Sequence, residues 1–186
     1  MINIAIDGPA GAGKSSLSKL LAKELSYIYV DTGALYRAVG LKFSRMGFDT
    51  ELKGDIDTIL EDTMLDIRFV DGAQRVFLDG EDVSDDIRTP AASMMASAVS
   101  AKPVVREFLL GMQRKLAEKN NVVMDGRDIG TVILPGADVK IFLTADVKVR
   151  AERRYKELLE KGREVSFEEV LEDMKIYTSK TPTAVE

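Results

Sequence analysis

Eight residues near the start of the chain have the types and the spacing that hold the phosphates of a nucleoside triphosphate. Gly8 to Ser15 read Gly-Pro-Ala-Gly-Ala-Gly-Lys-Ser, which is a glycine, four residues and then Gly-Lys-Ser. Glycines allow the backbone to approach anionic oxygens with its N–H groups pointing inward. Lys14 is expected to reach the β- and γ-phosphates, and the Ser15 hydroxyl to contact a bound Mg²⁺.

Two further polar segments follow short apolar runs. Asp31 to Arg37 comes after the run Tyr27 to Val30, and Asp125 to Thr131 comes after the run Val122 to Met124. In open parallel sheets, ligands bind beyond the carboxyl ends of the strands. We therefore expect both segments to face the site that the phosphate loop lines.

The elements around the loop predict an α/β fold. The apolar run from Met1 to Ile6 ends in Asp7, as a buried parallel strand would. A helix is predicted over Ser15 to Leu25, with four leucines on one face, and another from Asp31 to about Gly47. Strand and helix alternate here, which favours a parallel sheet of the P-loop NTPase type flanked by helices. The four leucines are Leu17, Leu20, Leu21 and Leu25.

The middle of the chain has a different pattern. Leu65 to Val70 and Arg75 to Leu78 are strand-like runs split by Asp71-Gly72-Ala73-Gln74, a hairpin signal. We therefore predict a small antiparallel insert over residues 57–90, with the core formed by residues 1–56 and 91–186. Helical pattern resumes at Ala91, breaks at Pro103 and continues to about Lys119.

The last third returns to strands and helices. Val122 to Met124 and Val139 to Thr144 are predicted to be buried strands. Asp146 could cap a helix that reaches Lys161, with Gly162 just beyond its end. Ser166 and Glu169 have the spacing of a capping box for one more helix.

Composition excludes several kinds of chemistry. The 186 residues contain no His and no Cys, so imidazole catalysis, thiol chemistry and Cys-based zinc sites are excluded. The formal net charge of −5 argues against a nucleic-acid partner, because such binding needs an excess of Lys and Arg. No signal peptide or membrane span is predicted, so we expect a cytoplasmic protein without a membrane partner. With no obvious exposed apolar stripe, we expect a monomer.

As a set, five groups of residues resemble the bacterial cytidylate kinases, which belong to the nucleoside monophosphate kinases. The resemblance covers about residues 1–175 and implies transfer of the γ-phosphoryl group of ATP to CMP or dCMP, with Mg²⁺ as cofactor. The segments that carry it are Ile4 to Ser16, Asp31 to Arg37, Gly80 to Ser84 with Ile87 and Arg88, Val104 to Glu107, and Asp125 to Thr131.

The resemblance also implies roles on the donor side. Lys14, Arg127, Asp125 and Arg153 would be catalytic, and Asp125 with Ser15 would hold Mg²⁺, Asp125 through a metal-bound water. Arg153, together with Arg150 and Arg154, would belong to a lid at about residues 147–175. The donor-binding residues would be Gly8, Pro9, Ala10, Gly11, Ala12, Gly13, Lys14, Ser15, Ser16 and Arg153.

On the acceptor side, the resemblance implies a pocket for the monophosphate. Thr32, Tyr36 and Arg37 would line the nucleotide pocket. Arg106 and Arg127 would hold the acceptor phosphate, and Ser97 and Asp128 would hydrogen-bond the cytosine. An acceptor that is already a phosphate needs no strong general base, so the absence of His is no handicap.

Other interpretations stay open at this point. The chain could be another small-molecule P-loop kinase, or a regulatory module that binds ATP and transfers little; a GTPase is disfavoured because no Asn-Lys-x-Asp segment is present. Arg150 and Arg154 could form a solvated helix face paired with Glu152 and Glu157. After Lys175 the resemblance breaks, and we expect a missing lid loop, with residues 176–186 as a remnant of a terminal strand and helix start.

Overall fold

The strand that leads into the phosphate loop lies inside a small parallel sheet. In the computed structural model, which describes residues 1–70, 73–160 and 162–180, β1 (Asn3–Asp7) lies between β6 (Val122–Asp125) and β7 (Val139–Phe142). β1 pairs in parallel with β7, so that Ile4 lies opposite Val139 and Asp7 lies opposite Phe142. The apolar strands β1 and β6 are buried, as the sequence predicts.

β7 does not match the buried strand that its sequence suggests. It ends at Phe142 rather than Thr144, and the side chains of Val139 and Phe142 are 44% and 41% exposed. The reason is topological, because β7 is the last strand of this sheet in the part of the chain that the structure describes. An edge strand has a neighbour on one side only, so apolar composition does not ensure its burial.

α1 (Lys14–Leu25) forms as predicted but buries a different face. Ser18 and Ala22 are its buried residues, whereas Leu20 is 59% exposed and Leu25 is 42% exposed. Leu17 and Leu21 are half-buried, so the four leucines share one side of the helix without forming its most buried face. α1 packs against β1, and the small side chains of Ser18 and Ala22 permit a close approach at that contact.

Helices α2, α4 and α5 enclose a large apolar cluster, whose buried residues lie between Leu35 and Leu109. α2 (Thr32–Arg45) follows β2 (Ile28–Asp31), and Asp31 caps it by accepting from the Ala34 N–H. α4 (Pro90–Ser100) and α5 (Pro103–Lys119) both start with proline, whose missing N–H costs nothing at that position. The cluster also includes α3 (Ile56–Glu61), which the sequence analysis did not predict.

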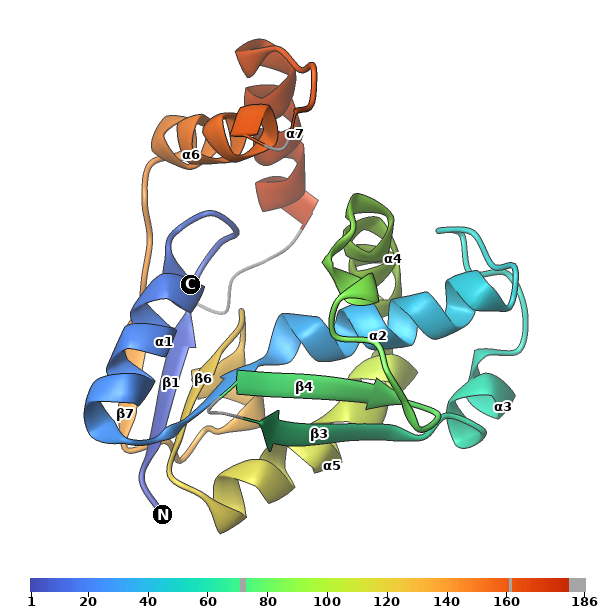
Figure 1. Ribbon diagram of the computed structural model, residues 1–186, viewed down its shortest axis with the longest axis vertical. Helices are drawn as coiled ribbons and strands as arrows, with labels where there is room; N and C mark the ends of the chain where they lie inside the picture. The colour runs from blue at the N-terminus through green and yellow to red at the C-terminus, as the bar shows by residue number, and fades with distance from the viewer. Residues whose placement is uncertain (71–72, 161, 181–186) are drawn as a thin grey trace. The chain divides into compact units, whose positions relative to one another are not determined.

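The predicted hairpin is present and belongs to a three-stranded antiparallel sheet. β3 (Leu65–Val70) pairs with β4 (Ala73–Leu78), and β4 pairs with the two-residue strand β5 (Glu81–Asp82) (Figure 1). β4 begins two residues earlier than expected, and residues 71–72 of the predicted turn lie outside the described residues. A short helical turn, η1 (Asp86–Arg88), follows the sheet.

Apolar contacts and ion pairs hold this sheet to α2. Val76 and Leu78 pack with Ala38 in one buried cluster. At the surface, Arg45 makes two bonds of 2.6 and 3.0 Å to the Glu81 carboxylate. The apolar packing orients the sheet on α2, and the bidentate bond of Arg45 to Glu81 adds a contact with a defined geometry.

The last two helices form a pair with its own core. α6 (Val147–Glu160) packs against α7 (Phe167–Lys180) through Ala151, Val170 and Met174. The predicted capping box is confirmed, because the Glu169 N–H donates to the Ser166 hydroxyl and the Ser166 N–H donates to the Glu169 carboxylate.

The predicted ends of these two helices can be compared in part. α6 stops at Glu160 and Gly162 has a positive φ of 70°, while residue 161 lies outside the described residues. α7 continues through residue 180, so the expectation of a terminal strand is wrong for residues 176–180. Residues 181–186 lie outside the described part.

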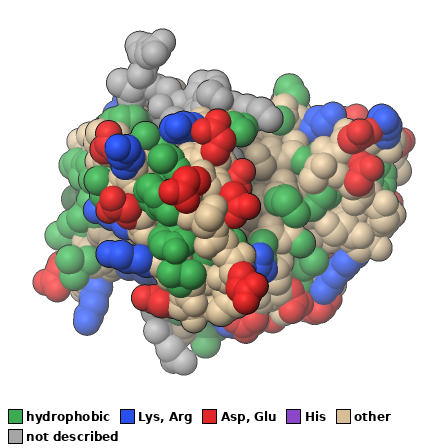
Figure 2. Space-filling view, turned by 90° about the horizontal axis from the view of Figure 1, so that it is seen from above, with side chains coloured by type: hydrophobic (Ala, Val, Ile, Leu, Met, Phe, Trp, Pro, Cys, Tyr) green, Lys and Arg blue, Asp and Glu red, His purple; other side chains and the backbone are tan. Residues whose placement is uncertain are grey.

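By the density of their contacts, the described residues fall into two compact units. One comprises residue 1 and the described residues of 27–122, and the other comprises residues 2–26 and the described residues of 123–180. The boundaries predicted for core, insert and lid stay predictions. Among the described residues, no helix is long and apolar enough to cross a membrane. On the face drawn in Figure 2, acidic and basic side chains are interspersed, with no continuous patch of one sign.

Replacing a helical glycine by alanine should have opposite effects on stability at two positions. A Cβ on Gly40 of α2 would lie 2.9 Å from the Met95 Cβ and 3.1 Å from the Ala96 backbone nitrogen, whereas a Cβ on Gly111 of α5 would meet nothing within 4 Å. Gly40→Ala should lower the free energy of unfolding by roughly 1–2 kcal/mol, because overpacking outweighs the gain in helix propensity. Gly111→Ala should raise it by about 0.5–1 kcal/mol.

Urea denaturation of the two variants beside the parent protein measures both changes. Equal stability of Gly40→Ala and Gly111→Ala would contradict the close packing of α2 on α4.

Candidate active site

The loop between β1 and α1 has the backbone conformation that its glycines predict. Gly8, Gly11 and Gly13 have φ angles of 145°, 75° and 100°, which L side chains rarely adopt. A Cβ on Gly8 would also collide with the Leu143 carbonyl oxygen, so the chain directly after β7 passes too close for any other residue. α1 begins at Lys14, directly after the loop, and its N-terminal N–H groups and dipole favour an anion there.

Lys14 and Ser15 lie at the start of this helix with different partners. The Lys14 ammonium donates to the Pro9 carbonyl at 2.9 Å, so it lies over the loop. The Ser15 hydroxyl donates to the Asp125 carboxylate at 2.8 Å, across 110 residues of sequence. Asp125 is buried at the end of β6, so the structure brings together the two residues predicted to hold Mg²⁺.

The carboxylate of Asp7 ties the loop to the segment after β6. Asp7 is 7% exposed, and its two oxygens accept from the N–H groups of Ile129 and Gly130 at 2.7 and 2.8 Å. Burial raises the pKa of Asp7, while these two hydrogen bonds and the charge of Lys14 act to lower it. The last residue of β1 thus anchors η2 (Ile129–Ile133), the helical turn that follows Asp128.

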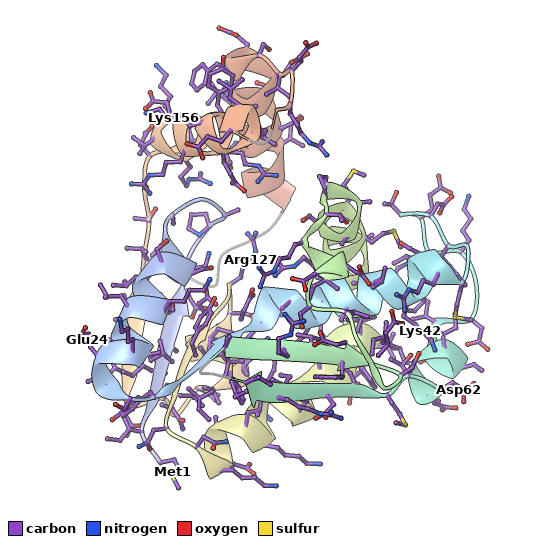
Figure 3. The ribbon with its side chains drawn as sticks, viewed as in Figure 1. Met1, Glu24, Lys42, Asp62, Arg127 and Lys156 are labelled. Carbon is purple, nitrogen blue, oxygen red and sulfur yellow. The ribbon has the colours of Figure 1, made fainter. Side chains whose placement is uncertain are left out.

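Arg127 and Asp128 lie in the short connection between β6 and η2. Both are half-buried, and the Asp128 carbonyl accepts from the Val132 and Ile133 N–H groups at 2.9 and 3.2 Å. In Figure 3, Arg127 projects at the end of the sheet where the loop follows β1. Within this unit, the structure therefore places Arg127 and Asp128 at the same end of the strands as the phosphate loop.

Three arginines of α6 have three different environments. Arg153 is exposed and donates to the Ala12 and Gly11 carbonyls at 3.2 and 3.4 Å. Arg154 pairs with Glu157 at 2.9 Å, which is the helix-face pairing considered from the sequence. Arg150 is only 3% exposed. Burial lowers the pKa of Arg150; Asp146 acts to raise it and Arg127 to lower it.

Most of the predicted acceptor residues belong to the other unit, at the start of α2 and along α4 and α5. Thr32 is buried and Tyr36 packs against the large apolar cluster. Arg37 donates to the Asp31 carboxylate at 2.9 Å, and its buried Nε has no hydrogen-bond partner among the described residues. Ser97 and Arg106 are exposed on α4 and α5.

Several residues that organise these segments were not singled out from the sequence. Gln74 of β4 accepts from the Asp31 N–H at 2.8 Å and donates to the Asp31 carbonyl at 3.2 Å, so it clamps the β2–α2 corner. Asp7 and Arg150 were read only as a strand end and a lid residue. A carboxylate directly before a phosphate loop is the one signal that could have marked Asp7, and no spacing marks Gln74.

Comparison with known proteins gives a consistent result. The family described as cytidylate kinase matches residues 4–178. The cytidylate kinase of Caldicellulosiruptor bescii is 55% identical over 174 residues, which are 94% of this chain and 77% of that protein. The cytidylate kinase of Caldanaerobacter subterraneus subsp. tengcongensis is 56% identical over 174 residues, 94% of this chain and 76% of that one.

A solved structure titled TT1252 from Thermus thermophilus aligns with a TM-score of 0.44 and 21% identity, over 96% of this chain and 81% of that one. The family match extends over the phosphate loop, the segment from Asp31 and the segment from Asp125. The chain belongs to the cytidylate kinase family.

Proposed function

We propose that this chain transfers the γ-phosphoryl group of ATP to CMP or dCMP and releases ADP with CDP or dCDP. One observation carries the proposal: the family match over residues 4–178 contains an intact phosphate loop whose Ser15 is bonded to Asp125. The loop accounts for the donor, and membership of the family accounts for the acceptor. No observation on this chain favours a different acceptor or a regulatory module.

On the donor side, the loop backbone and Lys14 would hold the β- and γ-phosphates. The Ser15 hydroxyl and Asp125 carboxylate are hard oxygen donors 2.8 Å apart, which fits Mg²⁺. No group of three acidic side chains in the described residues could hold a metal by itself, and Mg²⁺ commonly completes its shell with water and substrate phosphates. When bound, the ion would neutralise charge between the phosphates.

Arg37 offers the best support on the acceptor side. Its Nε–H is buried without a partner in the described residues, which is costly unless an acceptor arrives. A phosphate oxygen would satisfy it, and the planar guanidinium suits phosphate recognition. We assign Arg106 and Arg127 to the same phosphate, and Thr32 and Tyr36 to the nucleotide.

Asp128 is our candidate for reading the base. A carboxylate oxygen can accept from the exocyclic amino group of cytosine, which uracil lacks. Ser97 would add a second hydrogen bond. The backbone around Asp128 is held by η2, which Asp7 anchors, so a carboxylate there has a defined position.

The chemical step needs position and charge rather than a base. An oxygen of the acceptor phosphate is the nucleophile, so Lys14, Arg127 and Arg153 act by placing the two phosphates and stabilising developing charge. Closure of a lid at about residues 147–175 would keep water from the phosphoryl group. The proposal places the protein in pyrimidine nucleotide metabolism; a cytoplasmic location and a monomeric state stay predictions.

The first test of the proposed function is the preference for the acceptor nucleotide. In a coupled assay of ADP release with ATP, kcat/KM should be highest for CMP and dCMP in a panel that also contains UMP, AMP and GMP. Preference for UMP or AMP would overturn the cytidylate assignment. No turnover with any acceptor would favour an ATP-binding module.

Removing the ammonium of Lys14 should abolish transfer while the fold is kept. Lys14→Ala should lower kcat/KM for CMP by roughly 10³-fold or more, because the variant loses charge stabilisation on the transferred group. Lys23→Ala, at an exposed position of the same helix, is the matched control and should retain the parent rate. Near-native activity of Lys14→Ala would contradict the assigned role.

Asp128→Ala should weaken base selection more than catalysis. The ratio of kcat/KM for CMP to that for UMP should fall by roughly 10- to 100-fold, the discrimination that one good base contact supplies. Asp62→Ala changes an exposed aspartate and serves as the control (Figure 3). An unchanged ratio in Asp128→Ala would exclude this carboxylate as the reader of cytosine.

A further inference from the structure

The first turns of α6 lie against the phosphate loop. The Arg150 Nη1 donates to the Ala10 carbonyl at 3.1 Å, and its Nε donates to the Ala145 carbonyl at 3.0 Å. A Cβ on Gly11 would lie 3.2 Å from the Arg150 Cβ, so the backbone of the loop and the stem of this arginine are in close contact. Two parts of the chain 140 residues apart thus share a tight contact.

The bond from Arg150 to the Ala10 carbonyl also fixes the direction of the next backbone N–H group. In a trans peptide the C=O and the following N–H point in opposite directions. When Arg150 holds the Ala10 carbonyl, the N–H of Gly11 must point to the side away from Arg150. Arg153 has the same relation to the next peptides, since it binds the Ala12 carbonyl at 3.2 Å.

Arg150 is a buried residue that bonds to the backbone of the protein. The residue is 3% exposed, and a buried guanidinium is costly unless hydrogen bonds satisfy it. Its bonds to Ala145 and Ala10 join the connection after β7 to the loop after β1. Arg153 is exposed, and Arg154 is paired with Glu157, so Arg150 differs from both neighbours.

We propose that Arg150 is a positioning residue of the donor site, which orients the Gly11 N–H toward the triphosphate by holding the Ala10 carbonyl from behind. It acts through the backbone and does not touch the nucleotide. This assignment replaces a lid role for Arg150 and rests on the donor half of the proposed function only.

The test combines Arg150→Met, Arg150→Lys and a control, Lys156→Met, which removes a charge from an exposed position of α6 (Figure 3). The amide resonances of Gly11 and Gly13 are followed by ¹⁵N–¹H NMR without nucleotide, and the ADP dissociation constant is measured by titration. Arg150→Met should shift the Gly11 resonance in the nucleotide-free protein and weaken ADP binding by about tenfold, the value of one charge-assisted hydrogen bond.

The other two variants separate the effect of the Arg150 hydrogen bonds from that of a lost positive charge. Lys156→Met should match the parent protein in both measurements. Arg150→Lys should lie between, because an ammonium can donate to the Ala10 carbonyl but lacks the fixed fork that also reaches Ala145. In steady-state assays the KM for ATP should rise in Arg150→Met while the KM for CMP changes little.

Two results would overturn the inference. An unchanged ADP dissociation constant in folded Arg150→Met would remove the link to the donor site. Weaker ADP binding with an unchanged nucleotide-free Gly11 resonance would mean that Arg150 contacts the nucleotide directly. Should circular dichroism show Arg150→Met to be unfolded, Arg150→Lys decides by the same two criteria.

These measurements need no phosphoryl transfer. If the parent protein binds ADP but does not turn over CMP, the proposed function fails and the inference on Arg150 is still decided.

Discussion

The orientation of the peptide groups in the phosphate loop is the constraint on which the rest of this half of the chain depends. N–H groups that point inward require backbone angles that only glycine adopts easily, and Gly8, Gly11 and Gly13 supply them. That freedom has a cost, because a flexible loop would lose its orientation in solution. Leu143, directly after β7, lies against Gly8, and Arg150 of α6 lies against Gly11, so neighbouring segments restrict the loop that the glycines make possible. Preorganised dipoles of this kind stabilise charge without rearranging during the reaction.

Asp7 extends the same constraint to the segment after β6. Burial disfavours its charge, yet two backbone N–H groups and Lys14 favour the ionised form. A carboxylate that accepts from two consecutive N–H groups fixes both the position and the direction of η2. The Ser15–Asp125 bond gives a second link between the loop and the end of β6. The phosphate loop and the Asp125 carboxylate therefore form one connected framework, so that a displacement of one would also move the other.

The sequence predicts the local parts of this framework well and the long-range parts poorly. The phosphate loop, the hairpin at Leu65 and the capping box at Ser166 each depend on residues a few positions apart, so their signals lie in one window. The leucine pattern of α1 did not indicate that its most buried residues are the small Ser18 and Ala22, which suit a close approach to β1. The bond from Asp7 to Ile129 spans 122 residues, and the clamp of Gln74 on Asp31 spans 43. No sequence periodicity predicts such pairs, because the two partners meet only through the topology of the fold.

The corner between β2 and α2 holds Arg37, the arginine that we propose for the acceptor phosphate, in a defined position. Asp31 caps α2 with one oxygen, pairs with Arg37 through the other, and has its own peptide groups clamped by Gln74. Arg37 thus has little rotamer freedom left to lose when an anion binds. The Asp31 carboxylate also balances the charge of Arg37, while the buried Nε–H stays without a partner among the described residues. Asp31 is bonded to Nη2 of Arg37, so the proposed acceptor phosphate would meet the Nε–H without competing for the same nitrogen.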